Sequence, residues 1–178
     1  GVSLLDRLSL KPAQIHLGNQ SVIEEAQKKD RGIILLASHF GGYGLYHFFP
    51  LPIHKPLSVI MYIPKEKKTL ASTFYDSRFR FIDPSKKESI IFEALEVLKQ
   101  KELLLMMGDR VEKASRRYQE FPVSGMSLKL PEGPWNFAQS ADALVIPVFI
   151  VKRQKKYEVR VFSPIEVADS EAPHEKKA

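Results

Sequence analysis

Residues 32–44 read GIILLASHFGGYG, an apolar run that stops abruptly at a histidine followed by glycines. The run has the composition and length of a strand buried on both faces, as the strands of parallel sheets are. The glycines permit a tight turn and let a ligand come close to the backbone. A helix start is expected over residues 45–49, before Pro50. His39 is therefore predicted at the carboxyl end of a strand, where open α/β sheets bind their ligands.

The chemistry around His39 allows two interpretations. Histidine is the side chain that titrates unaided near neutral pH, which suits a general base. A single histidine after a strand is also often no more than a hydrogen-bonded turn residue. The residues next to it leave both interpretations open.

Strands and helices alternate along the rest of the chain, which is typical of an α/β domain with a mostly parallel central sheet flanked by helices. Strands are predicted at residues 57–63, 78–82, 103–107, 144–151 and 157–162. Helices are predicted at residues 21–30, 65–77, 88–100 and 135–140. The first of these helices has a capping box in which Ser21 is the N-cap and Glu24 lies three residues later. We expect a single domain over residues 1–178, with a polar tail from 168 to 178.

The helix over residues 88–100 has the clearest amphipathic pattern in the chain. Ile91, Leu95 and Leu98 recur at helical spacing, and Ile90, Ala94 and Val97 widen this apolar stripe, which is predicted to face the core. Residues 111–131, in contrast, show no clear periodicity. A stretch of that length in a compact domain is usually functional or disordered.

Composition limits the classes of function. With 178 residues and 44% hydrophobic content, the chain is long enough for a sizeable core. It contains no cysteine, which excludes disulfides, a thiolate nucleophile and thiolate metal ligands, and no metal site is expected. No stretch reaches the roughly 18 consecutive apolar residues that span a bilayer.

The net charge of +6 suits an anionic partner, such as a membrane surface, an acidic carrier protein or a phosphate-bearing substrate. Nucleic acid is not expected as the partner. The lysines and arginines are dispersed, and the aromatic residues stand within apolar runs instead of alternating with basic residues as in base-stacking platforms.

A second group of polar residues follows the strand predicted at 103–107, at the sheet edge expected for His39. Asp109 can orient an imidazole or hold a turn, and the guanidinium of Arg110 suits oxyanions. Capping of a loop explains this pair equally well. Glu132 precedes a predicted helix, where its charge complements the helix dipole.

These segments together resemble the lysophospholipid acyltransferase superfamily, and most closely its lipid A biosynthesis (late) acyltransferase branch. Members of that branch carry His-Phe-Gly-Asn-Trp-Glu, or a close variant, after a strand, and the family signature is a histidine, four residues, and an acid. This chain has HFGGYG at 39–44. Gly42 and Tyr43 stand where Asn-Trp is usual, and Gly44 stands where the family has its acid.

Further blocks follow in family order between about residues 21 and 164. Residues 108–110, Gly-Asp-Arg, resemble the acid-led second block, and residues 121–125 match a following Phe-Phe-Gly region loosely. Residues 130–135, LPEGPW, are similar to the block that begins the next helix. Residues 143–149, ALVIPVF, resemble the strand near the end of the family's domain.

The resemblance implies that a fatty acyl chain moves from an acyl thioester, on acyl carrier protein or coenzyme A, to a hydroxyl of a lipid or glycolipid. No other cofactor is implied. His39 would be the general base, and backbone N–H groups near Gly41 and Gly42 would support the oxyanion. The substrate-binding residues implied are Gly41, Gly42, Tyr43, Arg110, Glu132, Gly133 and Pro134. The protein is expected in a bacterial cytoplasm, bound peripherally at the inner face of the cell membrane.

Gly44 cannot supply the acid, and three explanations stay open. Asp109 or Glu132 reaches His39 from another loop, which is the explanation we favour. His39 works alone or through a water, at a lower rate. Alternatively, the protein is a non-catalytic relative that binds lipid or a partner. A thioester or ester hydrolase, with water as the acceptor at the same His39, is a further alternative.

Overall fold

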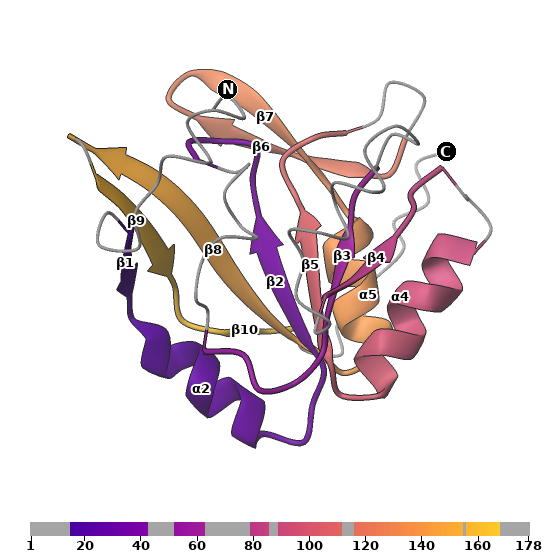
Figure 1. Cartoon of the computed structure of the whole chain (residues 1–178). Coiled ribbons are helices and arrows are strands. Elements are labelled where there is room, and N and C mark those ends of the chain that lie inside the picture. Colours follow the sequence, from indigo (N-terminus) through magenta and orange to yellow (C-terminus); the bar gives the residue numbers. More distant parts are fainter. Residues whose placement is uncertain are drawn as a thin grey trace.

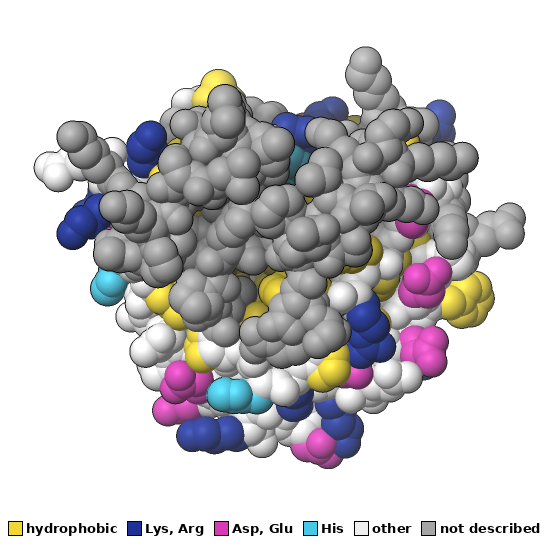
Figure 2. Space-filling model, in the orientation of Figure 1, with side chains coloured by type: hydrophobic (Ala, Val, Ile, Leu, Met, Phe, Trp, Pro, Cys, Tyr) yellow, Lys and Arg dark blue, Asp and Glu magenta, His cyan; other side chains and the backbone are white. Residues whose placement is uncertain are grey.

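The computed structural model describes residues 15–42, 52–62, 79–85, 89–111, 116–154 and 156–167. They form one large sheet with helices on its faces, and a separate two-stranded ribbon (Figure 1). Figure 2 shows the surface in the same orientation. The predicted elements at 45–49 and 65–77, and the predicted tail at 168–178, lie outside the described residues.

The large sheet has eight strands in the order β1-β9-β8-β2-β5-β3-β4, with β10 paired to β8. Its strands are β1 (Ile15–Gly18), β2 (Ile33–Ala37), β3 (Leu57–Ile60), β4 (Phe79–Ile82), β5 (Leu103–Met107), β8 (Leu144–Arg153), β9 (Lys156–Val161) and β10 (Ile165–Glu166). The pairs β1–β9, β2–β5, β2–β8, β3–β4 and β3–β5 are parallel, whereas β8–β9 and β8–β10 are antiparallel. The predicted α/β class with a mostly parallel sheet is confirmed.

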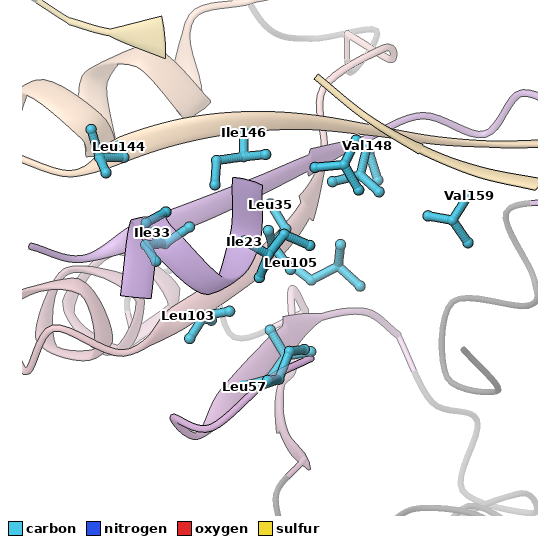
Figure 3. Close-up of a cluster of buried hydrophobic side chains, with 14 of the residues drawn as sticks. Ile23, Ile33, Leu35, Leu57, Leu103, Leu105, Leu144, Ile146, Val148 and Val159 are labelled. Carbon is cyan, nitrogen blue, oxygen red and sulfur yellow. The ribbon is translucent and has the colours of Figure 1, made fainter. Parts of the chain in front are cut away.

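The unbroken apolar run of β2 reflects burial on both faces of the sheet. Ile33 and Leu35 pack with Ile23 of α2 (Gln20–Lys28) in one cluster, which also receives side chains of β5 and β8 (Figure 3). Ile34 packs on the other face into a second cluster. This cluster includes Leu98 of α4 (Ser89–Lys99) and Ala138 of α5 (Gly133–Ser140). The helices therefore cover both faces, and a polar side chain would be costly at the four buried positions of β2, Ile33, Ile34, Leu35 and Ala37.

The predicted capping box of the first helix is wrong. Helix α2 begins at Gln20, so Ser21 lies inside it and is not the N-cap. The N-cap is Asn19, in the left-handed conformation with φ 51°, and it makes no side-chain capping bond. Asparagine tolerates this conformation, which turns the chain sharply from β1 into α2. Strand β1 itself, which pairs with β9, was not predicted.

The inner face of α4 is only part of the predicted stripe. Ala94, Val97 and Leu98 are buried, whereas Ile91 is 52% exposed and Leu95 is half-buried. The buried side chains lie three and four residues apart, on a stripe narrower than the apolar pattern of the sequence. Packing against the sheet and α5 therefore selects the face.

Residues 118–131 form an ordered ribbon, although no periodicity was recognised there. Strands β6 (Tyr118–Val123) and β7 (Met126–Pro131) pair antiparallel, with Val123 opposite Met126. The two residues between them, Ser124 and Gly125, have φ of 49° and 80°. Two positive φ angles are typical of the tight hairpin turns that match strand twist.

Candidate active site

The site is formed where two neighbouring parallel strands end. Strands β2 and β5 pair in register, with Ala37 opposite Met107. The Gly108 N–H donates to the Ala37 carbonyl at 2.9 Å, which continues the pairing beyond the strands. His39 and Asp109, each two residues after its strand, therefore emerge at the same edge of the sheet, the upper edge in Figure 1.

His39 and Asp109 contact each other through two hydrogen bonds. The His39 backbone N–H donates to Asp109 Oδ2 at 2.9 Å, and His39 Nδ1 lies 2.9 Å from Asp109 Oδ1. A carboxylate oxygen is an acceptor, so the neutral imidazole is assigned its proton on Nδ1 and carries its lone pair on Nε2. Their side chains are 26% and 30% exposed, so a substrate can approach the pair.

The glycines after His39 bring the loop against β8. Gly41 has φ of 66°, and a Cβ built on it would lie 2.1 Å from the Ile150 carbonyl oxygen. The Gly42 N–H donates to that same oxygen at 2.9 Å. Close backbone packing therefore requires glycine at position 41, and the Gly42 amide, expected near an oxyanion, is bonded to β8 instead.

A shallow groove lies beside the two residues that follow His39. It has a volume of about 420 Å³ and is lined by Phe40, Gly41, Val151, Lys152, Arg153 and Arg160. Phe40 is 70% exposed. Glu158 contacts both arginines, with its carboxylate 3.4 Å from Arg153 Nε and 3.2 Å from Arg160 Nε. The three cations outnumber this one acid, so the groove favours an anionic group.

The cations of the groove were not identified from the sequence. Lys152 and Arg153 belong to the basic run at residues 152–156, which has the composition of a solvated turn. Arg160 is on β9, and the antiparallel β8–β9 pairing places it opposite Phe149. The sequence signal that could have indicated these cations is the basic run directly after the apolar strand predicted at 144–151.

The other predicted substrate-binding residues are only partly accounted for. Arg110 is exposed beside Asp109. Glu132 lies at the start of α5, where its backbone N–H donates to the Arg117 carbonyl and its carbonyl accepts from the Asn136 N–H. Gly133 begins the helix, and Pro134 is buried in its first turn.

Tyr43 and Gly44 lie outside the described residues. Among the residues that are described, no group of three His, Asp or Glu side chains is placed to hold a metal ion. Within the same ranges, no helix is long and apolar enough to cross a membrane.

The fold and the pair define an α/β protein with a histidine and a carboxylate at the carboxyl edge of a parallel sheet. Residues 9–177 match the model of the bacterial lipid A biosynthesis acyltransferase family, and the chain belongs to that family. This confirms the family resemblance found in the sequence.

Among solved structures, the fold is similar to the crystal structure of the 1-acyl-sn-glycerophosphate (LPA) acyltransferase PlsC from Thermotoga maritima. The TM-score is 0.54 at 14% sequence identity, over 90% of this chain and 64% of that one. The chain thus spans less than two thirds of the length of PlsC. Curated proteins give no match.

Proposed function

We propose that this protein transfers a fatty acyl chain from an acyl thioester to a hydroxyl group of a lipid or glycolipid. Membership of an acyltransferase family supports the reaction class. The observation that carries the assignment to named residues is the Asp109 carboxylate on Nδ1 of His39.

In this mechanism Nε2 of His39 takes the proton of the acceptor hydroxyl as its oxygen attacks the thioester carbonyl carbon. Asp109 orients the ring and stabilises the imidazolium that forms. The tetrahedral intermediate then collapses, the C–S bond breaks, and His39 returns the proton to the departing thiolate. An ester and a free thiol result, and no enzyme nucleophile is required.

Asp109 takes the place of the acid that the family motif has at the position of Gly44. The two oxygens of its carboxylate reach both the ring and the backbone of His39. This favours the explanation in which the acid comes from another loop. The two remaining explanations, an unassisted histidine and a non-catalytic relative, become outcomes of the experiments below.

Two neighbouring features support substrate binding in the proposal. Because the Gly42 amide is bonded to Ile150, Gly41 is the candidate of the two for an oxyanion donor. The groove with Lys152, Arg153 and Arg160 suits an anionic part of a substrate, such as a phosphate. Both donors proposed, acyl carrier protein and coenzyme A, carry phosphate, and the acceptor would lie in the cytoplasmic face of a membrane.

The proposal is tested by acyl transfer from a panel of carrier-protein and coenzyme A thioesters, with a total lipid extract as acceptor. Wild type and His39→Ala are run side by side on samples of equal folded content. Labelled lipid formed by wild type and lost in the variant is the expected result. Release of free fatty acid without transfer would identify a hydrolase, and neither product from folded wild type would indicate a non-catalytic relative.

A further inference from the structure

The ribbon of β6 and β7 has two chemically different faces. Cross-strand partners lie on the same face, and side chains alternate along each strand. Phe121 is opposite Leu128, and Val123 is opposite Met126, so these four share one face. Tyr118, Glu120, Ser127 and Lys129 belong to the other face by the same register.

The first face is apolar and open to solvent. Phe121, Val123, Met126 and Leu128 are 42%, 46%, 72% and 44% exposed. Four large apolar side chains gathered on one small ribbon form a patch, which differs from the scattered apolar residues of an ordinary surface. Such a patch marks an interaction site.

The opposite face holds the ribbon together on its own. Ser127 Oγ donates to Glu120 Oε2 at 2.8 Å, Lys129 Nζ lies 3.2 Å from Glu120 Oε1, and the same ammonium donates to the Tyr118 hydroxyl. Bonds from Ser127 and Lys129 lower the pKa of the Glu120 carboxyl, and bonds to Tyr118 and Glu120 raise the pKa of Lys129. The polar face is thus internally paired, whereas the large apolar side chains of the other face stay exposed to solvent.

The ribbon stands at the edge of the sheet that carries His39 and Asp109. Six residues separate Asp109 from Arg116, and Figure 1 draws the ribbon across the upper edge of the sheet, where β2 and β5 end. Arg116 and Arg117, both exposed, lead directly into β6. Figure 2 shows basic side chains along this upper rim, whereas most acidic ones lie lower on the visible face.

We propose that the apolar face of the β6–β7 ribbon inserts into the headgroup region of an anionic lipid bilayer, with Arg116 and Arg117 on the lipid phosphates. An apolar surface bordered by arginines complements the two layers of such an interface, acyl chains beneath negative headgroups. Docking in this way turns the sheet edge with His39 toward the bilayer. The inference deepens the proposed function, since a lipid acceptor would then be presented to the base.

Vesicle sedimentation tests the proposal without any need for turnover. The whole chain is mixed with phosphatidylcholine vesicles that contain or lack phosphatidylglycerol, and the bound fraction is measured against salt. The double variant Val123→Ser/Met126→Ser should bind on the order of ten-fold more weakly, because the inserted apolar area is removed. Arg116→Gln/Arg117→Gln should lose roughly five-fold per arginine and show a shallower salt dependence.

The matched control is Ile91→Ser/Phe92→Ser on α4, whose side chains are 52% and 76% exposed. It removes similar exposed apolar area elsewhere and should leave vesicle binding unchanged. Equal losses in both double variants, or no binding of wild type to anionic vesicles, would overturn the proposal. So would ribbon-dependent dimerisation in sedimentation velocity, or ribbon-dependent capture of acyl carrier protein, in the absence of vesicle binding.

Acyl transfer in detergent-dispersed lipid separates this inference from the proposed function. Ribbon-dependent vesicle binding without any transfer would support the docking surface and reject the enzyme. Transfer in detergent, together with vesicle binding that the ribbon variants leave unchanged, would reject the docking surface and support the proposed enzyme activity.

Discussion

Asp109 binds His39 at two points, the backbone N–H and the imidazole Nδ1, each at 2.9 Å. One side chain therefore both orients the ring and holds the loop after β2 in place. A carboxylate can accept at both points, whereas an amide has one acceptor oxygen and one donor nitrogen. Substitution by asparagine should consequently disturb the pair far more than its size suggests.

We predict that Asp109→Asn reduces the rate of acyl transfer by about 10²–10⁴-fold, close to the loss in His39→Ala. The variant loses the negative charge beside the imidazolium and an acceptor for either Nδ1–H or the backbone N–H. The measurement is kcat for thioester-dependent transfer under saturating donor.

A thermal melt accompanies that comparison, because the loop contact is also lost. Asp109→Glu, which keeps the charge at a longer reach, is the control and should retain more activity than Asp109→Asn. Wild-type kcat in a folded Asp109→Asn sample would show that the pair holds the loop and has no part in the chemistry.

The meeting of His39 with Asp109 was predictable from the sequence in part. Both residues follow apolar runs, and the carboxyl ends of parallel strands share an edge. The sequence does not say, however, that β2 and β5 are neighbours, because β3 and β4 lie between them along the chain. The choice between Asp109 and Glu132 as the acid therefore needed the strand order.

Other features depend on tertiary contacts that no local pattern encodes. The glycines at 41 and 42 indicated a turn, but the sequence did not indicate that this turn packs against the Ile150 carbonyl of β8. Arg160 joins Arg153 in the groove because β9 pairs antiparallel with β8. Likewise Ile91 matches the apolar period of α4 and yet faces solvent.

The constraint at Gly41 gives a prediction for stability. Gly41→Ala forces a side chain into a positive φ and to within 2.1 Å of a carbonyl oxygen, and should cost about 3 kcal/mol or more of unfolding free energy. The control is Gly125→Ala, where φ is 80° and nothing lies within 4 Å, so backbone strain alone applies, about 1 kcal/mol. Urea unfolding measures both. Equal losses of unfolding free energy in the two variants would mean that the loop at Gly41 moves away from Ile150 without a further energetic cost.

The packing of α4 gives a second stability prediction. Leu98→Ala should lower the unfolding free energy by about 2–5 kcal/mol, because Leu98 is 1% exposed within the second core cluster. Ile91→Ala, at a position 52% exposed, should change it by less than about 1 kcal/mol. If the two substitutions lowered the unfolding free energy equally in urea, Ile91 would face the core, as the apolar period suggests.

The basic groove beside His39 should act on substrate binding and not on the chemical step. Arg153→Gln and Arg160→Gln remove cations that line the groove, so we expect KM for the anionic substrate to rise roughly three- to ten-fold with kcat little changed. Titrations of donor and of acceptor, each with the other saturating, show which substrate the groove binds.

Arg31→Gln is the control, because it also removes one positive charge. Arg31 pairs with Asp142 at 2.7 Å and lies just before β2, at the opposite end of that strand from His39. If Arg31→Gln raised KM as much as the groove variants, the effect would come from net charge. A fall in kcat with KM unchanged would instead place these arginines in the chemical step.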